Sequence, residues 1–583
     1  MSPTWTPTRS SWMRSGLSSA TRLPPPEGRD PMLEYQSDTT RSNTPTHQVV
    51  GDLARVGHRY ASALLTASTA TMFRGPADPA ATPLPPALTD RRFSDPAWNT
   101  SRYFHLLQQS YLLGAELVAE TLDTLPVSRS DRQRLRFLAR LAVEATAPTN
   151  FLIGNPAALR KARRTRGRSL LRGAANFIGD LGNNYGLPTV VDSTGFVKGR
   201  DLAPTPGRVV FRNHLMELIQ YEPRTEKVHT VPLLICSSWV NKYYIADLAP
   251  GLSVIRWLID QGHTVFVISY RNPDKTLRDV GFEHYLREGP LAAMPVVRSI
   301  TGVDEINLAG WCLGGLLALM TAAWLADQAD ALPRLRSITM LNSLADFTDI
   351  AQVTDTGVLG MPIDSVVLGV IDRVMAWQGY LDGRAIEAFF RLLKTDDMVW
   401  HHVITRWLLG EPPKPSILLA WNCDVVNVPY RAQRYLLHDL CMNNAFAAGT
   451  AELNGRLVRP GDIEQDVFIV APRDDHIIPW QAAYRTIGLL CGDVRFHLVA
   501  GGHVAGILAS PGYWTNVRAS WTDDSEAWLR TATEHKGSWW QPWRAWLADR
   551  SGPLRSPPRI GNAHHPAQEP APGTYVRHPM EVK

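Results

Sequence analysis

The segment Gly310-Trp311-Cys312-Leu313-Gly314-Gly315 decides how this chain folds. It joins a short apolar run, residues 306–311, to a longer apolar run with small residues, which is typical of a buried strand followed by a buried helix. A nucleophile at such a junction, with small residues two positions before and two after it, forms an elbow in which strand and helix approach closely. Here the nucleophile is a cysteine. The pattern predicts a reactive thiol raised above the end of a buried strand, at the positive end of a helix dipole that favours a thiolate.

Outward from this elbow, the chain alternates short apolar runs with helical patterns. Near-continuous apolar strands separated by helices indicate a mostly parallel sheet with helices on both faces. Together with the elbow, this predicts an α/β-hydrolase fold. The expected strands are residues 231–238, 263–270, 306–311, 337–343, 466–472 and 494–501.

In an elbow enzyme the acid and the base follow the nucleophile in that order, each after a strand. Asp474 and Asp475 follow the run 466–472, and their adjacency leaves the choice between them open. His503 lies on a glycine-rich stretch at the end of the run 494–501, whereas His476 precedes that run and is the poorer base. These residues predict a Cys–His–Asp triad.

An acyl-transfer site also needs donors for the oxyanion. We expect the backbone N–H of Leu313 and one from the Trp239–Val240 turn to supply them. A small structural cysteine beside a glycine-packed helix is the alternative interpretation of Cys312.

The run Ile306–Ala326 has 21 residues without a charge, enough to cross a bilayer. Its three glycines and its flanking acids favour a buried strand and helix, so we predict no transmembrane segment. The sequence has no HExxH motif, and His214 with Glu217 has no further ligand nearby. No metal site and no cofactor are predicted.

Composition excludes several classes of protein. With 44% hydrophobic and 20% charged residues, the 583-residue chain is neither wholly disordered nor fibrous. A net charge of +5 gives little support for nucleic-acid binding. Five cysteines without CxxC spacing argue against a disulfide framework and a cysteine zinc site, and favour the cytoplasm. The amino terminus lacks the apolar stretch of a secretory signal.

Composition also divides the chain. Residues 1–88 are rich in Pro, Ser, Thr and Arg and are predicted to be a disordered tail, and residues 89–205 a helical N-terminal domain. Residues 206–550 are the predicted catalytic domain, with a helical lid insertion at about 345–440. Residues 551–583 form a Pro-rich tail that we expect to extend along the surface.

Many motifs resemble the polyhydroxyalkanoate synthases of the long, single-subunit kind (class I and II). The resemblance runs from about Asp90 to Val576 and resolves the acid in favour of Asp475, with Cys312 and His503 as its partners. Matching stretches include DRRFSDPAW (90–98), APTNFLIGNPAAL (147–159), WVNKYYIADL (239–248), GWCLGG (310–315), GYLDGR (379–384), DDHIIPW (474–480), GGHVAGI (501–507) and APGTYV (571–576).

The resemblance implies an acyltransferase that joins (R)-3-hydroxyacyl units from coenzyme A thioesters into a polyester and releases coenzyme A through an S-acyl cysteine. It also implies a homodimer bound to polyester granules in the cytoplasm. The stretches GYLDGR and LADFTD (344–349) resemble the short-chain, poly(3-hydroxybutyrate)-forming class. Four positions depart from the family pattern and leave substrate preference in doubt: Ser237, Ser238, Tyr270 and Val426.

Two other functions remain open. A cysteine-dependent α/β-hydrolase, a thioesterase or esterase, would use the same triad and pass the acyl group to water. A non-catalytic scaffold would rest on the basic run 160–172 and on Trp539, Trp540, Trp543 and Trp546. We expect the basic run to be a solvated helix face and the tryptophans to pack in the core of a closing helix.

Overall fold

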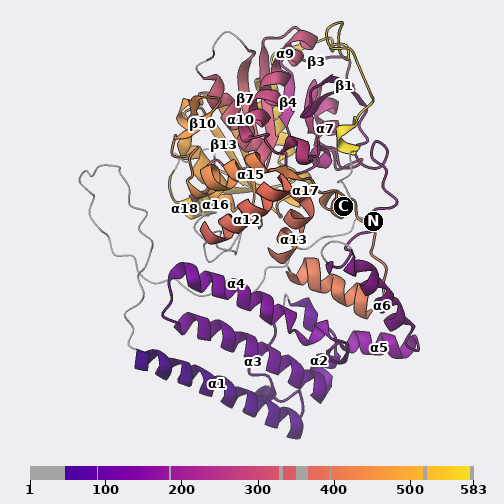
Figure 1. Cartoon of the computed structure of the whole chain (residues 1–583), viewed down its shortest axis with the longest axis vertical. Coiled ribbons are helices and arrows are strands. Elements are labelled where there is room, and N and C mark those ends of the chain that lie inside the picture. The colour runs from indigo at the N-terminus through magenta and orange to yellow at the C-terminus, as the bar shows by residue number, and fades with distance from the viewer. Residues whose placement is uncertain are drawn as a thin grey trace, which may run out of the picture. The chain divides into compact units, whose positions relative to one another are not determined.

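The computed structural model describes residues 46–87, 90–182, 186–326, 328, 332–348, 365–393, 395–516 and 522–577. These residues form two compact units (Figure 1). The first contains the described residues up to Thr189 together with Arg391–Pro412, and the second contains the rest. The predicted boundary near 205 and the predicted single lid at 345–440 therefore differ from the units that the contacts define.

The second unit is built on a ten-stranded sheet. Its first two pairings at one edge and its last two at the other are antiparallel, and the strands between them are parallel. In spatial order the strands are β1 (Gly207–Arg212), β2 (Met216–Tyr221), β5 (Val265–Tyr270), β4 (Leu233–Cys236), β6 (Glu305–Trp311), β7 (Arg334–Leu341), β12 (Asp466–Pro472), β13 (Val494–Val499), β14 (Gly512–Thr515) and β15 (Thr533–Lys536).

This strand order identifies the fold. Numbered along the chain, the first eight strands of the sheet lie in the order 1-2-4-3-5-6-7-8, with the second strand antiparallel to its neighbours. The fifth, β6, leads into helix α10 (Leu313–Leu325) at the cysteine elbow. That is the α/β-hydrolase arrangement, so the fold prediction is confirmed.

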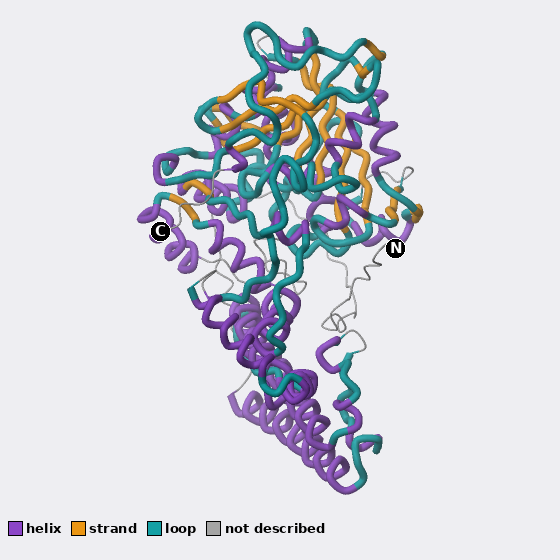
Figure 2. The backbone as a smooth tube through the Cα atoms, turned by 90° about the vertical axis from the view of Figure 1, so that its right-hand side faces the viewer, coloured by secondary structure: helices purple, strands orange, loops and turns teal. Residues whose placement is uncertain are grey.

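The strands are buried on both faces, which explains their continuous apolar runs. Alternate residues point to two different cores: Leu308 of β6 to one, Ala309 and Trp311 to the other. Helices α8 (Phe282–Glu288), α9 (Pro290–Thr301) and α10 cover the first core, and α7 (Val254–Asp260), α17 (Ala505–Ala509) and α19 (Trp540–Asp549) the second. Figure 2 shows the strands enclosed by helices and loops.

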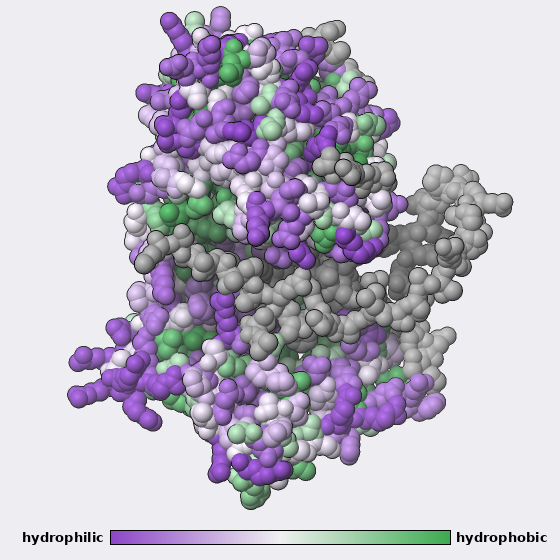
Figure 3. Space-filling model, turned by 180° about the vertical axis from the view of Figure 1, so that it is seen from behind, coloured by the Kyte–Doolittle hydropathy of each residue, from purple (hydrophilic) through white to green (hydrophobic). Residues whose placement is uncertain are grey.

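The C-terminal tryptophans belong to this second core. Trp539 and Trp543 are essentially unexposed and Trp546 is buried. The indole of Trp543 donates to Thr339 Oγ1 of β7 at 2.9 Å. The expected core role of this cluster is confirmed for these three residues. On the face of the second unit turned to the viewer in Figure 3, most of the surface is hydrophilic.

The first unit is helical, with α1 (Thr46–Phe73), α2 (Ala97–Thr100), α3 (Arg102–Thr124), α4 (Arg129–Ala145), α5 (Pro156–Arg164) and α6 (Arg168–Leu181). Helix α1 corrects the prediction of a disordered tail over residues 1–88. Its buried positions Val49, Val56, Ala67 and Ala70 share one helical face against α3, and small alanines made that face hard to recognise. The part of that tail before residue 46 lies outside the described residues.

The basic run 160–172 falls on two helices rather than one. Helix α5 ends near Arg164, and α6 begins after Gly167, which has a φ of +80°. Within the same unit, Lys161 forms an ion pair with Glu411 at 2.6 Å and Arg160 with Asp95. The run therefore contributes to packing as well as to a solvated surface.

The segment Arg391–Pro412 joins the first unit through a buried acid. Asp180 of α6 accepts from Arg406 Nε at 2.6 Å and from the Trp407 indole at 2.8 Å. A Cβ at Gly173 would lie 1.8 Å from the Trp407 carbonyl oxygen, so only glycine allows this approach. The remaining described parts of the predicted lid, including α12 (Ser365–Gln378) and α14 (Ile417–Asn422), belong to the second unit.

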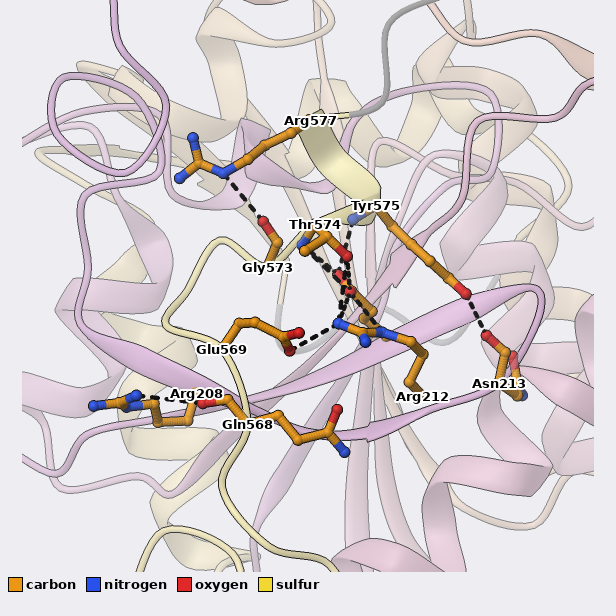
Figure 4. A network of polar contacts seen from close by, with 10 residues as sticks. Arg208, Arg212, Asn213, Gln568, Glu569, Gly573, Thr574, Tyr575 and Arg577 are labelled. Atoms are coloured by element: carbon orange, nitrogen blue, oxygen red, sulfur yellow. Dashed lines mark hydrogen bonds and ion pairs between the residues drawn. The ribbon is translucent and has the colours of Figure 1, made fainter.

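The C-terminal segment bonds to the edge of the sheet. Main-chain bonds of 2.8–3.0 Å join Val209 of β1 to Gln568 and Glu569. The carboxylate of Glu217, fully buried on β2, accepts from Arg212, from Thr574 N and Oγ1, and from Tyr575 N. Figure 4 shows Arg212, Thr574 and Tyr575 of this network. The tail thus covers an edge that would otherwise present unpaired backbone groups.

A membrane-spanning segment would need a long, apolar helix. None of the helices in the described ranges meets that requirement.

Candidate active site

Cys312 occupies a strained turn between β6 and α10. Its φ is +50° and ψ −123°, a conformation that costs a non-glycine residue on the order of 1–3 kcal/mol and is found mainly at functional sites. Its N–H donates to the Leu341 carbonyl oxygen at 2.9 Å. A Cβ at Gly310 would lie 2.2 Å from Gly314 O, and one at Gly314 2.1 Å from Cys236 O. The two glycines therefore allow the elbow, for the steric reason that the sequence predicted.

Asp475 and His503 lie at the carboxyl ends of two neighbouring parallel strands, β12 and β13. Asp475 Oδ2 is 2.7 Å from His503 Nδ1, and its Oδ1 accepts from the N–H groups of Ile477 and Ile478 at 2.8 and 2.9 Å. Because a carboxylate only accepts, Nδ1 must carry a proton, which leaves Nε2 to act as base. Asp474 is exposed and has no such contact, so burial separates the two adjacent aspartates.

The imidazole of His503 also interacts with the thiol of Cys312. Burial, the largest effect, lowers the pKa of His503, but the charge and hydrogen bond of Asp475 and the hydrogen bond and charge of Cys312 together raise it to about 10. A raised pKa is what a partner thiolate produces, because the ion pair stabilises the protonated imidazole. The structure therefore brings together the three predicted residues Cys312, Asp475 and His503.

A cavity lined by Cys312 and His503 opens at this triad. One part of its lining is polar, with Ser237, Ser238, Asn241 and Lys242 from the segment after β4. Apolar groups complete it, among them Trp421 of α14, whose indole donates to the Lys242 carbonyl oxygen at 2.9 Å. A tryptophan from the predicted lid segment thus forms part of the wall beside the nucleophile.

None of the residues predicted to supply oxyanion donors lines this cavity. Leu313, Trp239 and Val240 are absent from its lining. Leu313 is the first residue of α10, where backbone N–H groups lack intrahelical acceptors. The Val240 N–H points to Ser238 Oγ at 3.4 Å, and the Trp239 ring packs in the core against Phe282. The role of these three residues remains a prediction.

Two of the family departures lie at the same place. Ser237 Oγ donates to the Ile268 carbonyl oxygen, and Ser238 Oγ accepts from Val240. Prolines would lack both hydroxyls. Tyr270 is buried against Tyr285, with ring centroids 5.0 Å apart, and Val426 is buried.

Sequence reasoning missed Lys242 and Asn342. Lys242 is 4% exposed, its Nζ has no hydrogen-bond partner among the described residues, and burial lowers its pKa to about 8. Asn342 is 2% exposed and contacts His503 directly. Asn342 follows a strand of the sheet, and the rule that located Asp475 and His503 could have found it. In the described part of the chain, no group of three His, Cys, Asp or Glu side chains is arranged to hold a metal ion.

The strand order and the elbow define the class of protein: an enzyme with the α/β-hydrolase fold. A family model described as "Poly-beta-hydroxybutyrate polymerase (PhaC) N-terminus" matches residues 89–258. The chain is 38% identical over 502 residues to the poly(3-hydroxyalkanoate) polymerase subunit PhaC of Cupriavidus necator, covering 84% of this chain and 83% of that one. The chain therefore belongs to the poly(3-hydroxyalkanoate) polymerase family.

A second relative agrees with this membership. The poly(3-hydroxyalkanoate) polymerase of Methylorubrum extorquens is 37% identical over 531 residues, covering 90% of this chain and 86% of that protein. Among solved structures, a monoacylglycerol lipase of Paleococcus ferrophilus is similar at 15% identity and a TM-score of 0.31, covering 57% of this chain and 100% of that one. Because that likeness is weak, the fold assignment rests on the strand order.

Proposed function

We propose that this enzyme polymerises (R)-3-hydroxyacyl-coenzyme A thioesters into polyhydroxyalkanoate, with Cys312 as nucleophile, His503 as general base and Asp475 as its orienting partner. The observation that carries the proposal is one imidazole bonded on Nδ1 to a buried carboxylate at 2.7 Å and interacting with the elbow thiol. Family membership supplies the substrate class.

The proposed chemistry has two half-reactions. In the first, the Cys312 thiolate attacks the thioester carbonyl, a C–S bond to the enzyme forms, and coenzyme A leaves as a thiol after taking a proton from His503. In the second, the 3-hydroxyl of an incoming unit gives its proton to His503 and attacks the S-acyl carbonyl. An ester forms, and Cys312 is released. The N–H of Leu313, with one from the Trp239–Val240 turn, would stabilise the oxyanion in each step.

The hydroxyl must reach the S-acyl cysteine in preference to water, so we assign a lid function to the described helices within residues 345–440 of the second unit. Trp421 supports this assignment because it belongs to that segment and lines the cavity beside Cys312. Excluding water from an activated acyl group suppresses hydrolysis.

The test is Cys312→Ala against Cys491→Ala, an exposed free cysteine, as the matched control. With 3-hydroxybutyryl-coenzyme A, we expect Cys312→Ala to release no coenzyme A and form no polymer, and Cys491→Ala to match the parent enzyme. Full activity in Cys312→Ala would contradict the assignment. If the parent enzyme yields soluble 3-hydroxy acid instead of insoluble polyester, it is a thioesterase.

We further propose that the enzyme is a homodimer associated with polyester granules in the cytoplasm, as the family resemblance implies. Sedimentation of the purified chain would test the dimer. Fractionation of cells that make polymer would test granule association, and recovery of the enzyme only in the granule-free fraction would contradict it.

A further inference from the structure

Asn342 lies in a strained position directly beside the triad. It follows the last residue of β7, and its φ is +39°, in the left-handed region that asparagine tolerates better than most residues. Its N–H donates to Val470 O at 2.8 Å, which ties it to β12. A buried polar residue held in this conformation next to a nucleophile is a candidate for a functional role.

The side chain of Asn342 makes two contacts with His503. Its Nδ2 is 3.0 Å from the His503 carbonyl oxygen and 3.0 Å from the ring atom Nε2. The carbonyl oxygen can only accept, so the amide NH₂ must face it, and the second amide hydrogen is then available to Nε2. This bond requires a lone pair on Nε2, as in the tautomer with the proton on Nδ1, next to Asp475.

Nε2 therefore has two competing partners, Asn342 Nδ2 and the Cys312 thiol. With a free thiolate, the charge of Cys312 favours a proton on Nε2, whereas the amide hydrogen of Asn342 opposes it. Acylation of Cys312 removes the negative charge and leaves the amide. Asp475 and Cys312 are the groups whose charges act on this imidazole, and Lys242 and Tyr243 line the same cavity.

We propose that Asn342 is a positioning residue that keeps Nε2 of His503 unprotonated once Cys312 is acylated, so that the imidazole can accept the proton of the incoming 3-hydroxyl. This inference rests on the proposed function. Asn342 acts in the second half-reaction, the transfer to the hydroxyl, whereas Asp475 orients His503 in both half-reactions. The Oδ1 of Asn342 is buried and has no partner in the part of the chain that the structure describes, as expected for an amide oriented by its NH₂ contacts.

The test uses the full chain with Cys312 alkylated by iodoacetamide, which gives an uncharged thioether that mimics the acylated state. The pKa of His503 is followed by NMR of isotope-labelled histidine, and its resonance is assigned by its loss in His503→Gln. We expect Asn342→Ala to raise this pKa by about 1, the equivalent of one lost hydrogen bond. Asn342→Asp should raise it further, because a carboxylate oxygen accepts from a protonated Nε2.

We expect the pKa of His503 to be highest with Asp at position 342, lower with Ala and lowest with Asn. A purely structural role of Asn342 would not give this order. Equal pKa values in the three proteins, or a lower value in Asn342→Asp, would overturn the proposal. Aspartate tolerates a positive φ, so Asn342→Asp keeps the test available if the alanine variant does not fold.

A kinetic measurement completes the test. In single-turnover experiments at pH 7, we expect Cys312 in Asn342→Ala to be acylated at a rate within about twofold of the parent. Transfer of the acyl group to the hydroxyl should be about tenfold slower, because a pKa of His503 raised by about 1 leaves about a tenth as much unprotonated base. Slowing of both steps alike would contradict the assignment. If the parent forms no polymer, the proposed function fails, but the NMR order still tests the contact between Asn342 and His503.

Discussion

Replacing Asp475 by asparagine tests the core of the proposed mechanism, because the new side chain has the same shape and no charge. In the parent enzyme, the Asp475 carboxylate accepts three hydrogen bonds, one from His503 Nδ1 at 2.7 Å and two from the Ile477 and Ile478 N–H groups. An amide has only one oxygen. If that oxygen faces the two N–H groups, the NH₂ faces Nδ1 and forces the proton onto Nε2, and the imidazole loses its basic atom.

The opposite orientation keeps the Nδ1 bond but directs the NH₂ at two backbone donors, so it loses two hydrogen bonds, whereas the first orientation keeps all three contacts of this side chain. At about 1 kcal/mol for each bond, the orientation with the wrong tautomer is favoured. In a serine triad the same type of change lowers kcat about 10⁴-fold. We expect a fall of about 10³- to 10⁴-fold here, since a thiol depends less on its base, which corresponds to about 4–5.5 kcal/mol in the barrier.

The assay is coenzyme A release from 3-hydroxybutyryl-coenzyme A, followed with a chromogenic thiol reagent. Asp474→Asn is the control, because the exposed neighbour should change the rate by less than about twofold. The pH dependence of Cys312 alkylation gives a second measurement. Without the Asp475 charge the pKa of His503 falls from about 10 towards its ordinary value, so the pH profile of alkylation should change. If Asp475→Asn retains more than about a tenth of the parent rate, or if Asp474→Asn is the more damaging change, the reasoning is wrong.

Two further predictions concern buried charges. Lys242→Met should raise the free energy of unfolding by about 1–3 kcal/mol at pH 7, since burial lowers the pKa of this ammonium to about 8. This gain in stability should shrink as pH rises from 8 to 10.5, because the unfolded chain also loses the proton there. Urea unfolding at several pH values measures the trend, and a gain that grows with pH would contradict the prediction. Glu217→Gln should lower the free energy of unfolding by about 2–4 kcal/mol, because the fully buried carboxylate binds Arg212 and the C-terminal segment. Glu569→Gln, which changes an exposed carboxylate on the same arginine, should lower it by less than about 1 kcal/mol. Similar losses of stability in the two variants would refute this account.

The sequence predicted those parts of the site that depend on local steric rules. An elbow needs small residues around its nucleophile, and catalytic groups in a parallel sheet follow strands, so Cys312 and His503 could be found from their neighbours alone. The choice between Asp474 and Asp475 could not, because adjacent residues in a loop differ only in direction. Burial and two backbone N–H groups make that distinction in the structure.

The parts that sequence reasoning missed depend on contacts between distant segments. Arg406 follows Asp180 by 226 positions, and nothing in either local pattern indicates that the pair joins residues 391–412 to the helical unit. Helix α1 escaped notice because its buried face consists largely of alanine and valine within a segment rich in threonine and serine. Asn342 was missed because the strand expected at residues 337–343 included it, whereas β7 ends at Leu341.

The proposed mechanism requires opposite properties of one imidazole. To keep Cys312 ionised, His503 needs a pKa well above neutrality; to accept a proton from a hydroxyl, it needs an unprotonated Nε2. Asp475 bonds to Nδ1 and not to Nε2, so it does not supply the difference. Cys312 supplies this difference. Its hydrogen bond and charge are among the causes that raise the pKa of His503, and forming the S-acyl bond removes that charge. Acylation therefore lowers the pKa of the base at the moment when a base is needed, and Asn342, which donates towards the same nitrogen, acts in the same direction.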